Sequence, residues 1–136
     1  MVLELLELSQ VLKAVETTGK EVRYHDKQCD TKQVSGFYQI GPNVDDLVIC
    51  PHNQHNHSDL FDTIRHEAIH VVQACNGGKA ILPYDYYIKN ATDETKRRVF
   101  TQYPKAHHHV ELEAFHAAEF LNEGNVVELI NKFCFE

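Results

Sequence analysis

The sequence predicts an α+β fold with a small sheet in its N-terminal half and helices in its C-terminal half. Apolar residues recur at spacings of three and four near the N-terminus and through the C-terminal half, which is the periodicity of amphipathic helices. Two apolar stretches between them flank the turn residues Gly41, Pro42 and Asn43, which is typical of a β-hairpin. The length of 136 residues, with 43 % hydrophobic and 24 % charged residues, corresponds to one globular domain over residues 1–136.

The N-terminal half is expected to hold one helix and about three strands. Residues 2–18 place apolar side chains on one helical face, and Gly19 ends this predicted helix. Alternating apolar and polar residues favour a short strand over residues 20–26. The two strands of the expected hairpin lie at residues 34–40 and 46–51.

The C-terminal half is expected to be helical. A long amphipathic helix begins near Ser58 or Asp59, whose side chains are suited to cap it, and runs to about residue 76, where Gly77 and Gly78 end it. The segment that follows, residues 80–91, contains Pro83 and a tyrosine cluster and is expected to be a loop. Three further helices are expected over residues 93–103, capped by Thr92 or Asp93, over 108–122, ended by Gly124, and over 126–135.

The composition disfavours two classes of protein. The chain has 20 acidic and 13 basic residues and a formal net charge of −7, whereas proteins that bind nucleic acid through its phosphates carry a basic surplus. No apolar stretch approaches the ~18 to 20 residues of a membrane-spanning helix. Nucleic-acid binding is therefore unexpected, and so is insertion into a membrane.

The cysteines and the N-terminus predict a cytoplasmic protein. Residues 1–10 lack the basic region that begins a secretory signal peptide. The four cysteines are scattered and form no C-x-x-C pair, which argues against a thiolate zinc site and against a dense disulfide framework. We therefore expect reduced thiols. The cysteines are Cys29, Cys50, Cys75 and Cys134.

The motif that carries chemistry is H-E-x-x-H at residues 66–70. The chain has ten histidines, and imidazole is the commonest metal ligand in proteins. On a helix His66 and His70 lie on one face, about one turn apart, so both can reach one Zn²⁺. Glu67 is offset by one residue, which places it beside the metal as a general acid and base rather than as a ligand.

A catalytic zinc needs a third protein ligand, and the region 107–116 is expected to supply it. It contains Glu111-Leu112-Glu113-Ala114. Here the sequence resembles the gluzincin class of zinc metallopeptidases, in which H-E-x-x-H is followed some tens of residues later by a helix with a ligand glutamate in an E-x-x-A-like setting. The resemblance makes Glu111 the third ligand. The small Ala114 would let the two helices approach closely.

Two alternatives for the third ligand remain open. Glu113 is the second choice, and because it lies about 200° around the helix from Glu111, the two carboxylates cannot both face the metal. His109 is the other alternative and would give an all-histidine site.

The resemblance implies a zincin-like fold and peptide-bond hydrolysis with Zn²⁺ as cofactor. Zinc-bound water would attack the carbonyl of a peptide or protein substrate, with Glu67 first as base and then as acid. An extended substrate would pair with an edge strand across the cleft, for which residues 46–51 are the candidate. Candidates to stabilise the oxyanion lie just before Glu111, namely Tyr103, His107 and His108.

Two other functions are compatible with the motif. The first is a catalytically silent zinc-binding interaction module, against which the intact Glu67 argues. The second is a DNA-associated protease of the SprT-like kind, a group that resembles this chain in its H-E-x-x-H motif. The net charge of −7 and the absence of a basic tail disfavour that second alternative.

Overall fold

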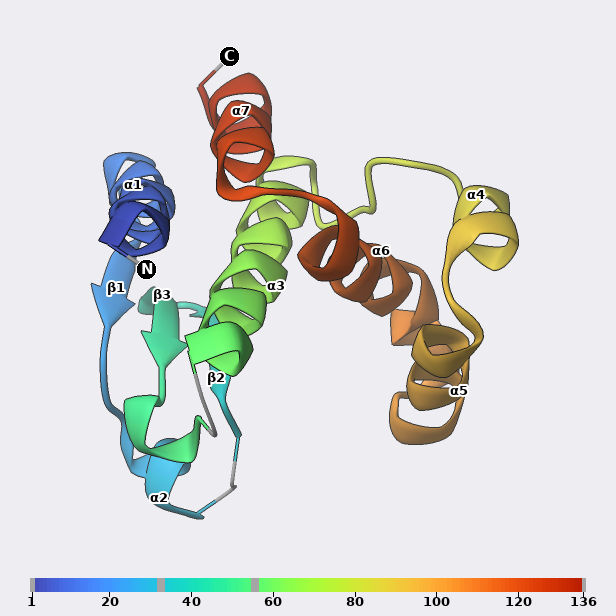
Figure 1. Cartoon of the computed structure of the whole chain (residues 1–136), viewed down its shortest axis with the longest axis horizontal. Coiled ribbons are helices and arrows are strands. Elements are labelled where there is room, and N and C mark those ends of the chain that lie inside the picture. Colours follow the sequence, from blue (N-terminus) through green and yellow to red (C-terminus); the bar gives the residue numbers. More distant parts are fainter. Residues whose placement is uncertain (1, 32–33, 55–56, 136) are drawn as a thin grey trace.

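A computed structural model describes residues 2–31, 34–54 and 57–135, and it has the predicted α+β class. Helices dominate and the sheet is small (Figure 1). The elements are α1 (Val2–Thr17), β1 (Glu21–Arg23), α2 (Lys27–Thr31), β2 (Gly36–Gly41), β3 (Val44–Ile49), α3 (His57–Cys75), α4 (Tyr84–Asn90), α5 (Asp93–Gln102), α6 (His108–Phe120) and α7 (Glu123–Cys134). Short 3₁₀ turns at Pro51–Asn53 and Lys105–His107 complete the order.

The sheet has three strands in the order β1-β3-β2. The predicted hairpin is present, since β2 and β3 are antiparallel, and β1 adds to the other side of β3 in parallel. The prediction that residues 46–51 form the edge strand across the cleft is therefore wrong. β3 is central because β1 pairs with it in parallel on the side opposite β2, which makes β2 an edge strand. A parallel pairing joins strands that are not connected by a tight turn, so no local sequence pattern reveals it.

Helix α3, which carries the H-E-x-x-H motif, lies at the centre of the fold. It contacts α1, α6 and α7 and the strands β2 and β3, with the sheet on one side and α4–α6 on the other (Figure 1). Its buried apolar positions follow the helical period and form much of the main core: Ile64, Ala68, Ile69, Val71 and Val72. This packing on two sides fixes the position of the motif.

The ends of most helices follow local sequence signals. Gly77 and Gly78 have φ angles of 73° and 82°, the left-handed conformation that glycine adopts at little cost where a helix ends. The Thr92 side chain caps α5 by accepting a hydrogen bond from the Thr95 backbone at 3.1 Å. The predicted cap of α3 by Asp59 is not observed, because α3 already includes Asp59; the side chain of Ser58 lies outside the described residues.

Two predicted boundaries are wrong. The segment expected to be a loop contains α4, which starts after Pro83 and buries Tyr87; this burial outweighs the local turn signals. Gly124 does not end α6, which stops at Phe120. It lies instead in the first turn of α7, after a capping box made by Asn122 and Asn125.

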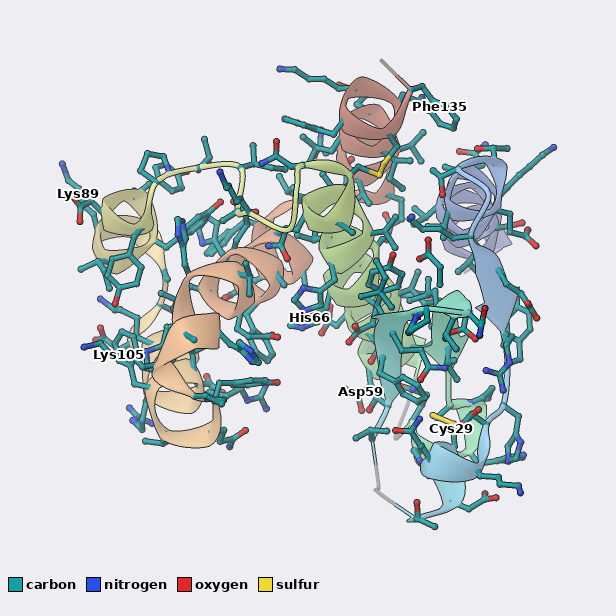
Figure 2. The ribbon with its side chains drawn as sticks, turned by 180° about the vertical axis from the view of Figure 1, so that it is seen from behind. Cys29, Asp59, His66, Lys89, Lys105 and Phe135 are labelled. Carbon is teal, nitrogen blue, oxygen red and sulfur yellow. A yellow bond between two sulfur atoms is a disulfide. The ribbon has the colours of Figure 1, made fainter. Side chains whose placement is uncertain are left out.

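The expectation of reduced thiols is also wrong. Disulfides join Cys29 to Cys50 and Cys75 to Cys134, and Figure 2 shows both bonds in yellow. Their sequence separations of 21 and 59 residues form no motif, so only the fold brings these cysteines together. Cytoplasmic location stays a prediction, and reduced thiols no longer support it. None of the described helices is both long and apolar enough to cross a bilayer.

Candidate metal centre

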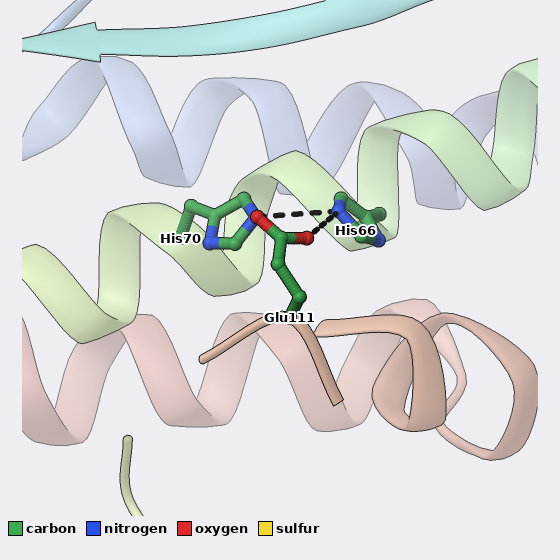
Figure 3. Close-up of side chains that lie close together, drawn as sticks. All are labelled: His66, His70 and Glu111. Carbon is green, nitrogen blue, oxygen red and sulfur yellow. Dashed lines mark hydrogen bonds and ion pairs between the residues drawn. The ribbon is translucent and has the colours of Figure 1, made fainter. Parts of the chain in front are cut away.

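Two helices bring three potential metal ligands together (Figure 3). His66 and His70 project from the same face of α3, and their Nε2 atoms are 3.2 Å apart. Glu111 enters from the first turn of α6. Its Oε1 lies 3.1 Å from His66 Nε2 and its Oε2 lies 3.2 Å from His70 Nε2. Each residue thus offers one ligand atom to a common point, and all these atoms lie within 4.8 Å of one another.

The spacing of the two imidazole nitrogens is compatible with a tetrahedral metal. Ligand atoms at 2.0–2.1 Å from a zinc ion, at tetrahedral angles, are about 3.3 Å apart, and the two Nε2 atoms are 3.2 Å apart. The contacts of Glu111 at 3.1 and 3.2 Å are made by its two different oxygens, Oε1 to His66 and Oε2 to His70. Two imidazole nitrogens and one carboxylate also leave a fourth position open, which is the ligand set of catalytic rather than structural zinc sites.

The protonation of this cluster is governed by its own contacts. Burial alone would raise the pKa of Glu111, but hydrogen bonds with His66 and His70 lower it to about 2. Burial would lower the pKa of His70, but the hydrogen bond with Glu111, the charges of Glu67 and Glu111 and the hydrogen bond with Gln73 together outweigh it and raise the value to about 9. A carboxylate ionised at neutral pH therefore faces the two rings, and a cation at their common point would compete with the proton on His70.

Glu67 lies beside the cluster without joining it. Its Oε2 is 4.0 Å from His66 Nε2, but Glu67 does not belong to the group of residues whose ligand atoms all lie within 4.8 Å of one another. Its carboxylate also accepts a hydrogen bond from the backbone N–H of Tyr38 in β2, and burial is the main reason that its pKa is raised. A buried, neighbouring but non-ligating carboxylate has the environment of a general acid and base.

His66 and Glu67 line a cleft of about 850 Å³. The start of β2 and the N-terminal part of α3 form one wall, whereas α5 and α6 form the other. Four further carboxylates lie around the cleft, and Arg98 is its one basic side chain among the lining residues. The four carboxylates belong to Asp59, Asp62, Glu94 and Glu119.

Comparison with known families adds a family but no activity. A family model described as a domain of unknown function (DUF8637) matches residues 2–135. The chain belongs to the DUF8637 family. No curated protein and no solved structure matches the chain. Any activity of this DUF8637 domain must therefore be argued from its own residues.

The DUF8637 structure separates the three candidates for the third ligand. Glu111 faces the two histidines. Glu113 points elsewhere and is buried, where its carboxylate accepts hydrogen bonds from Ile81, Leu82, Tyr87 and Gln73. His109 turns toward α4, with its Nε2 2.7 Å from the carbonyl oxygen of Leu82.

Of the predicted oxyanion stabilisers, only Tyr103 reaches the cleft. Its side chain lines the cleft wall, and burial, followed by the charges of Glu111 and Glu67, raises its pKa to about 12. His108 uses its Nε2 on the carbonyl oxygen of Tyr103 at 2.9 Å. His107 is exposed and does not line the cleft.

Two residues of the DUF8637 site were missed in the sequence. Gln73 lies three positions after His70, on the same helical face, and its Oε1 is 2.8 Å from His70 Nδ1; that spacing was a visible signal. Phe115 packs its ring 4.3 Å from the His66 ring. His66 Nδ1 is buried and has no hydrogen-bond partner among the described residues.

Proposed function

We propose that this chain is a zinc-dependent metallopeptidase with a zincin-like fold. The observation that carries the proposal is the convergence of His66, His70 and Glu111 from two helices, beside a cleft that His66 and Glu67 line. Two imidazoles and one carboxylate form a nitrogen and oxygen set suited to zinc. Bound zinc would polarise the scissile carbonyl group and lower the pKa of the attacking water.

Glu67 would move the protons. Its carboxylate lies within reach of a molecule held between the three ligands, and its raised pKa favours taking up a proton and later releasing it. The hydrogen bond from the Tyr38 backbone would hold the carboxylate in place between these two steps. The proton taken from water would then pass to the leaving amine.

Tyr103 would stabilise the oxyanion that forms during attack. Its hydroxyl has no hydrogen-bond partner among the described residues, and its pKa of about 12 keeps it protonated at neutral pH. A protonated hydroxyl on the cleft wall can donate a hydrogen bond to a developing negative charge.

A peptide suits this cleft better than nucleic acid. The acidic side chains around the cleft would repel a phosphate backbone, and the whole chain carries a formal charge of −7. These charges disfavour the SprT-like alternative. The silent zinc-binding module is separated from the peptidase by experiment.

The decisive experiment combines metal analysis with Glu67→Gln. Wild-type protein should hold about one zinc per chain and cleave members of a mixed peptide library. Glu67→Gln should keep the zinc and lose at least ~10²-fold in rate. The matched control is Glu128→Gln, which changes an exposed glutamate of α7 and should keep both properties.

Each other outcome contradicts a definite part of the proposal. Protein that takes up no zinc on titration rejects the metal site. Zinc-loaded wild type that cleaves nothing supports the silent module. Full activity in Glu67→Gln contradicts the role of Glu67 as general base.

A further inference from the structure

Gln73 belongs to the candidate metal centre although it lies outside the H-E-x-x-H motif. It stands one helical turn after His70 on α3, and only 3 % of its surface is exposed. Its Oε1 lies 2.8 Å from His70 Nδ1. This contact is on the ring nitrogen opposite the one that faces Glu111.

The neighbours of Gln73 fix which way its amide points. Its Nε2 lies 3.0 Å from the backbone oxygen of Val110 and 3.0 Å from Glu113 Oε1. Both partners can only accept hydrogen bonds, so the amide nitrogen must face them and the amide oxygen must face His70. His70 Nδ1 is then the donor, which leaves its Nε2 lone pair directed at His66 and Glu111 when the ring is neutral.

Glu113 is itself held firmly. Besides Gln73, its carboxylate accepts hydrogen bonds from the backbone N–H groups of Ile81 and Leu82 at 2.9 and 3.0 Å and from the Tyr87 hydroxyl at 2.7 Å. A buried carboxylate with four donors has little freedom to rotate. The hydrogen bonds therefore continue from the segment before α4, through Glu113 and Gln73, to His70.

His66 has no equivalent support. Its Nδ1 lacks a partner among the described residues, and its ring rests on Phe115 instead. The two histidines of the centre are thus held by different means: His70 by a chain of hydrogen bonds through Gln73 and Glu113, and His66 by packing against Phe115.

We propose that Gln73 is a positioning residue for the metal centre, which holds His70 in the tautomer and ring orientation that present Nε2 to the ion, and that Glu113 holds Gln73. Hydrogen-bonded partners of metal-bound histidines commonly contribute 10- to 100-fold in metal affinity. The inference rests on the proposed zinc site, but it concerns metal affinity and not the reaction catalysed there.

The test compares zinc affinities by competition with a chelator. Gln73→Met removes the amide with little change in size and should weaken zinc binding by about 10- to 100-fold. Gln54→Met is the matched control. Gln54 is a partly buried glutamine that, like Gln73, donates to backbone oxygen, here that of Ser35 and of Cys50, and it contacts no member of the centre. Its zinc affinity should stay within about threefold of wild type, below the effect of an orienting residue.

A spectroscopic readout separates positioning from general support of the fold. In zinc-loaded wild type, the nitrogen NMR spectrum should show His70 with a proton on Nδ1 that exchanges slowly, because Gln73 accepts it. In Gln73→Met this proton should exchange fast, while the signals of His66 stay in place. A substitution that only weakened the fold would not change the NMR signal of His70 while leaving that of His66 unchanged.

An exchange variant protects the test against misfolding. Gln73→Glu combined with Glu113→Gln returns an acceptor to His70 Nδ1 and a donor between the two side chains, although the backbone oxygen of Val110 loses the donor that Gln73 provides. Its zinc affinity should stay within about tenfold of wild type, since a carboxylate acceptor makes the imidazole more basic and offsets that loss.

The outcomes also distinguish this inference from the proposed function. Wild type that binds no zinc rejects the proposed function. Wild type that binds zinc, with an unchanged affinity and an unchanged His70 signal in Gln73→Met, overturns only the role of Gln73. If Gln73→Met fails to fold, the exchange variant provides the test. A zinc affinity that is tenfold or more below that of wild type in the folded exchange variant also overturns the role of Gln73.

Discussion

Glu111 and Glu113 show how two identical side chains, two positions apart on one helix, enter unrelated environments. About 200° of helical rotation separates them. Glu111 reaches the two imidazoles of α3, whereas Glu113 is 3 % exposed and surrounded by hydrogen-bond donors. The first is placed to bind a cation, and the second to hold the segment around α4.

The two glutamates should therefore respond differently to removal. Glu111→Ala should lower zinc affinity by more than about 100-fold, the upper range for losing a residue that only orients a ligand. Glu113→Ala should lower the unfolding free energy by about 3 to 5 kcal/mol, because buried donors lose their acceptor, and should weaken zinc binding less than Glu111→Ala does. Chelator competition and urea unfolding of both metal-free variants measure the two effects. A larger zinc loss in Glu113→Ala would reverse the assignment.

Tyr103 offers a test of the cleft that leaves the metal in place. Tyr103→Phe keeps the ring on the cleft wall and removes its hydroxyl, so kcat should fall about 100-fold, as for the loss of one oxyanion donor. KM and zinc content should hardly change. The matched control is Tyr84→Phe, since Tyr84 is exposed and contacts His109 outside the cleft. An unchanged kcat in Tyr103→Phe would show that Tyr103 does not stabilise the oxyanion.

The sequence was most informative about residues whose roles depend on local spacing. His66, Glu67 and His70 could be placed on one helix from their spacing alone, and the structure brings them together as expected. The choice between Glu111 and Glu113 needed the contact between α3 and α6, which no local pattern contains. The Gln73 contact was within reach of helical geometry, whereas its amide orientation depends on Glu113, 40 positions away.

Strand β2 is the element that connects the sheet to the candidate site. It lies at the edge of the sheet, its first residue Gly36 lines the cleft with the two residues before it, and the backbone N–H of Tyr38 donates a hydrogen bond to Glu67. This close approach depends on the absence of a side chain at Gly36. An added Cβ there would lie 2.8 Å from Thr63 Cγ2 and 2.9 Å from the backbone oxygen of Val48.

Gly36→Ala should accordingly destabilise the protein by about 1 to 3 kcal/mol, the usual range for overpacking a tight contact. Gly41→Ala in the same strand is the control, because nothing lies within 4 Å of its added Cβ, and its unfolding free energy should match wild type. Urea denaturation compares the three proteins. Equal stability of both variants would mean that β2 does not pack this closely on α3.

The elements themselves were predictable where the signal is local. The period of α3, its glycine end and the hairpin turn all come from neighbouring residues, and they appear as predicted. The parallel pairing of β1 with β3 and the burial of Tyr87 in α4 depend on distant partners. These long-range contacts are where the sequence pattern gave the wrong edge strand and the wrong loop.

At the scale of the whole molecule, the two disulfides join segments that local elements do not connect. Cys75 and Cys134 tie the last residues of α3 and α7 together, and Cys29 and Cys50 tie α2 to the end of β3. Neither bond touches the residues of the metal centre. Disulfides persist mainly in oxidising environments, so the pairing counts against the cytoplasmic location that the scattered cysteines suggested.

The pairing predicts how the protein responds to loss of each bond. Closing a loop of 59 residues should stabilise the fold by about 4 kcal/mol, and closing one of 21 residues by about 3 kcal/mol, through the entropy of the unfolded chain. Cys75→Ala with Cys134→Ala should therefore cost more stability in urea than Cys29→Ala with Cys50→Ala.

Because both bonds lie away from His66, His70 and Glu111, the zinc affinity of each folded double variant should equal that of wild type. Denatured, unreduced wild type should show no free thiol, and reduction should release four, one for each cysteine. Free thiols before reduction would contradict the pairing, and a loss of zinc affinity in either folded variant would show that the metal centre depends on these distant bonds.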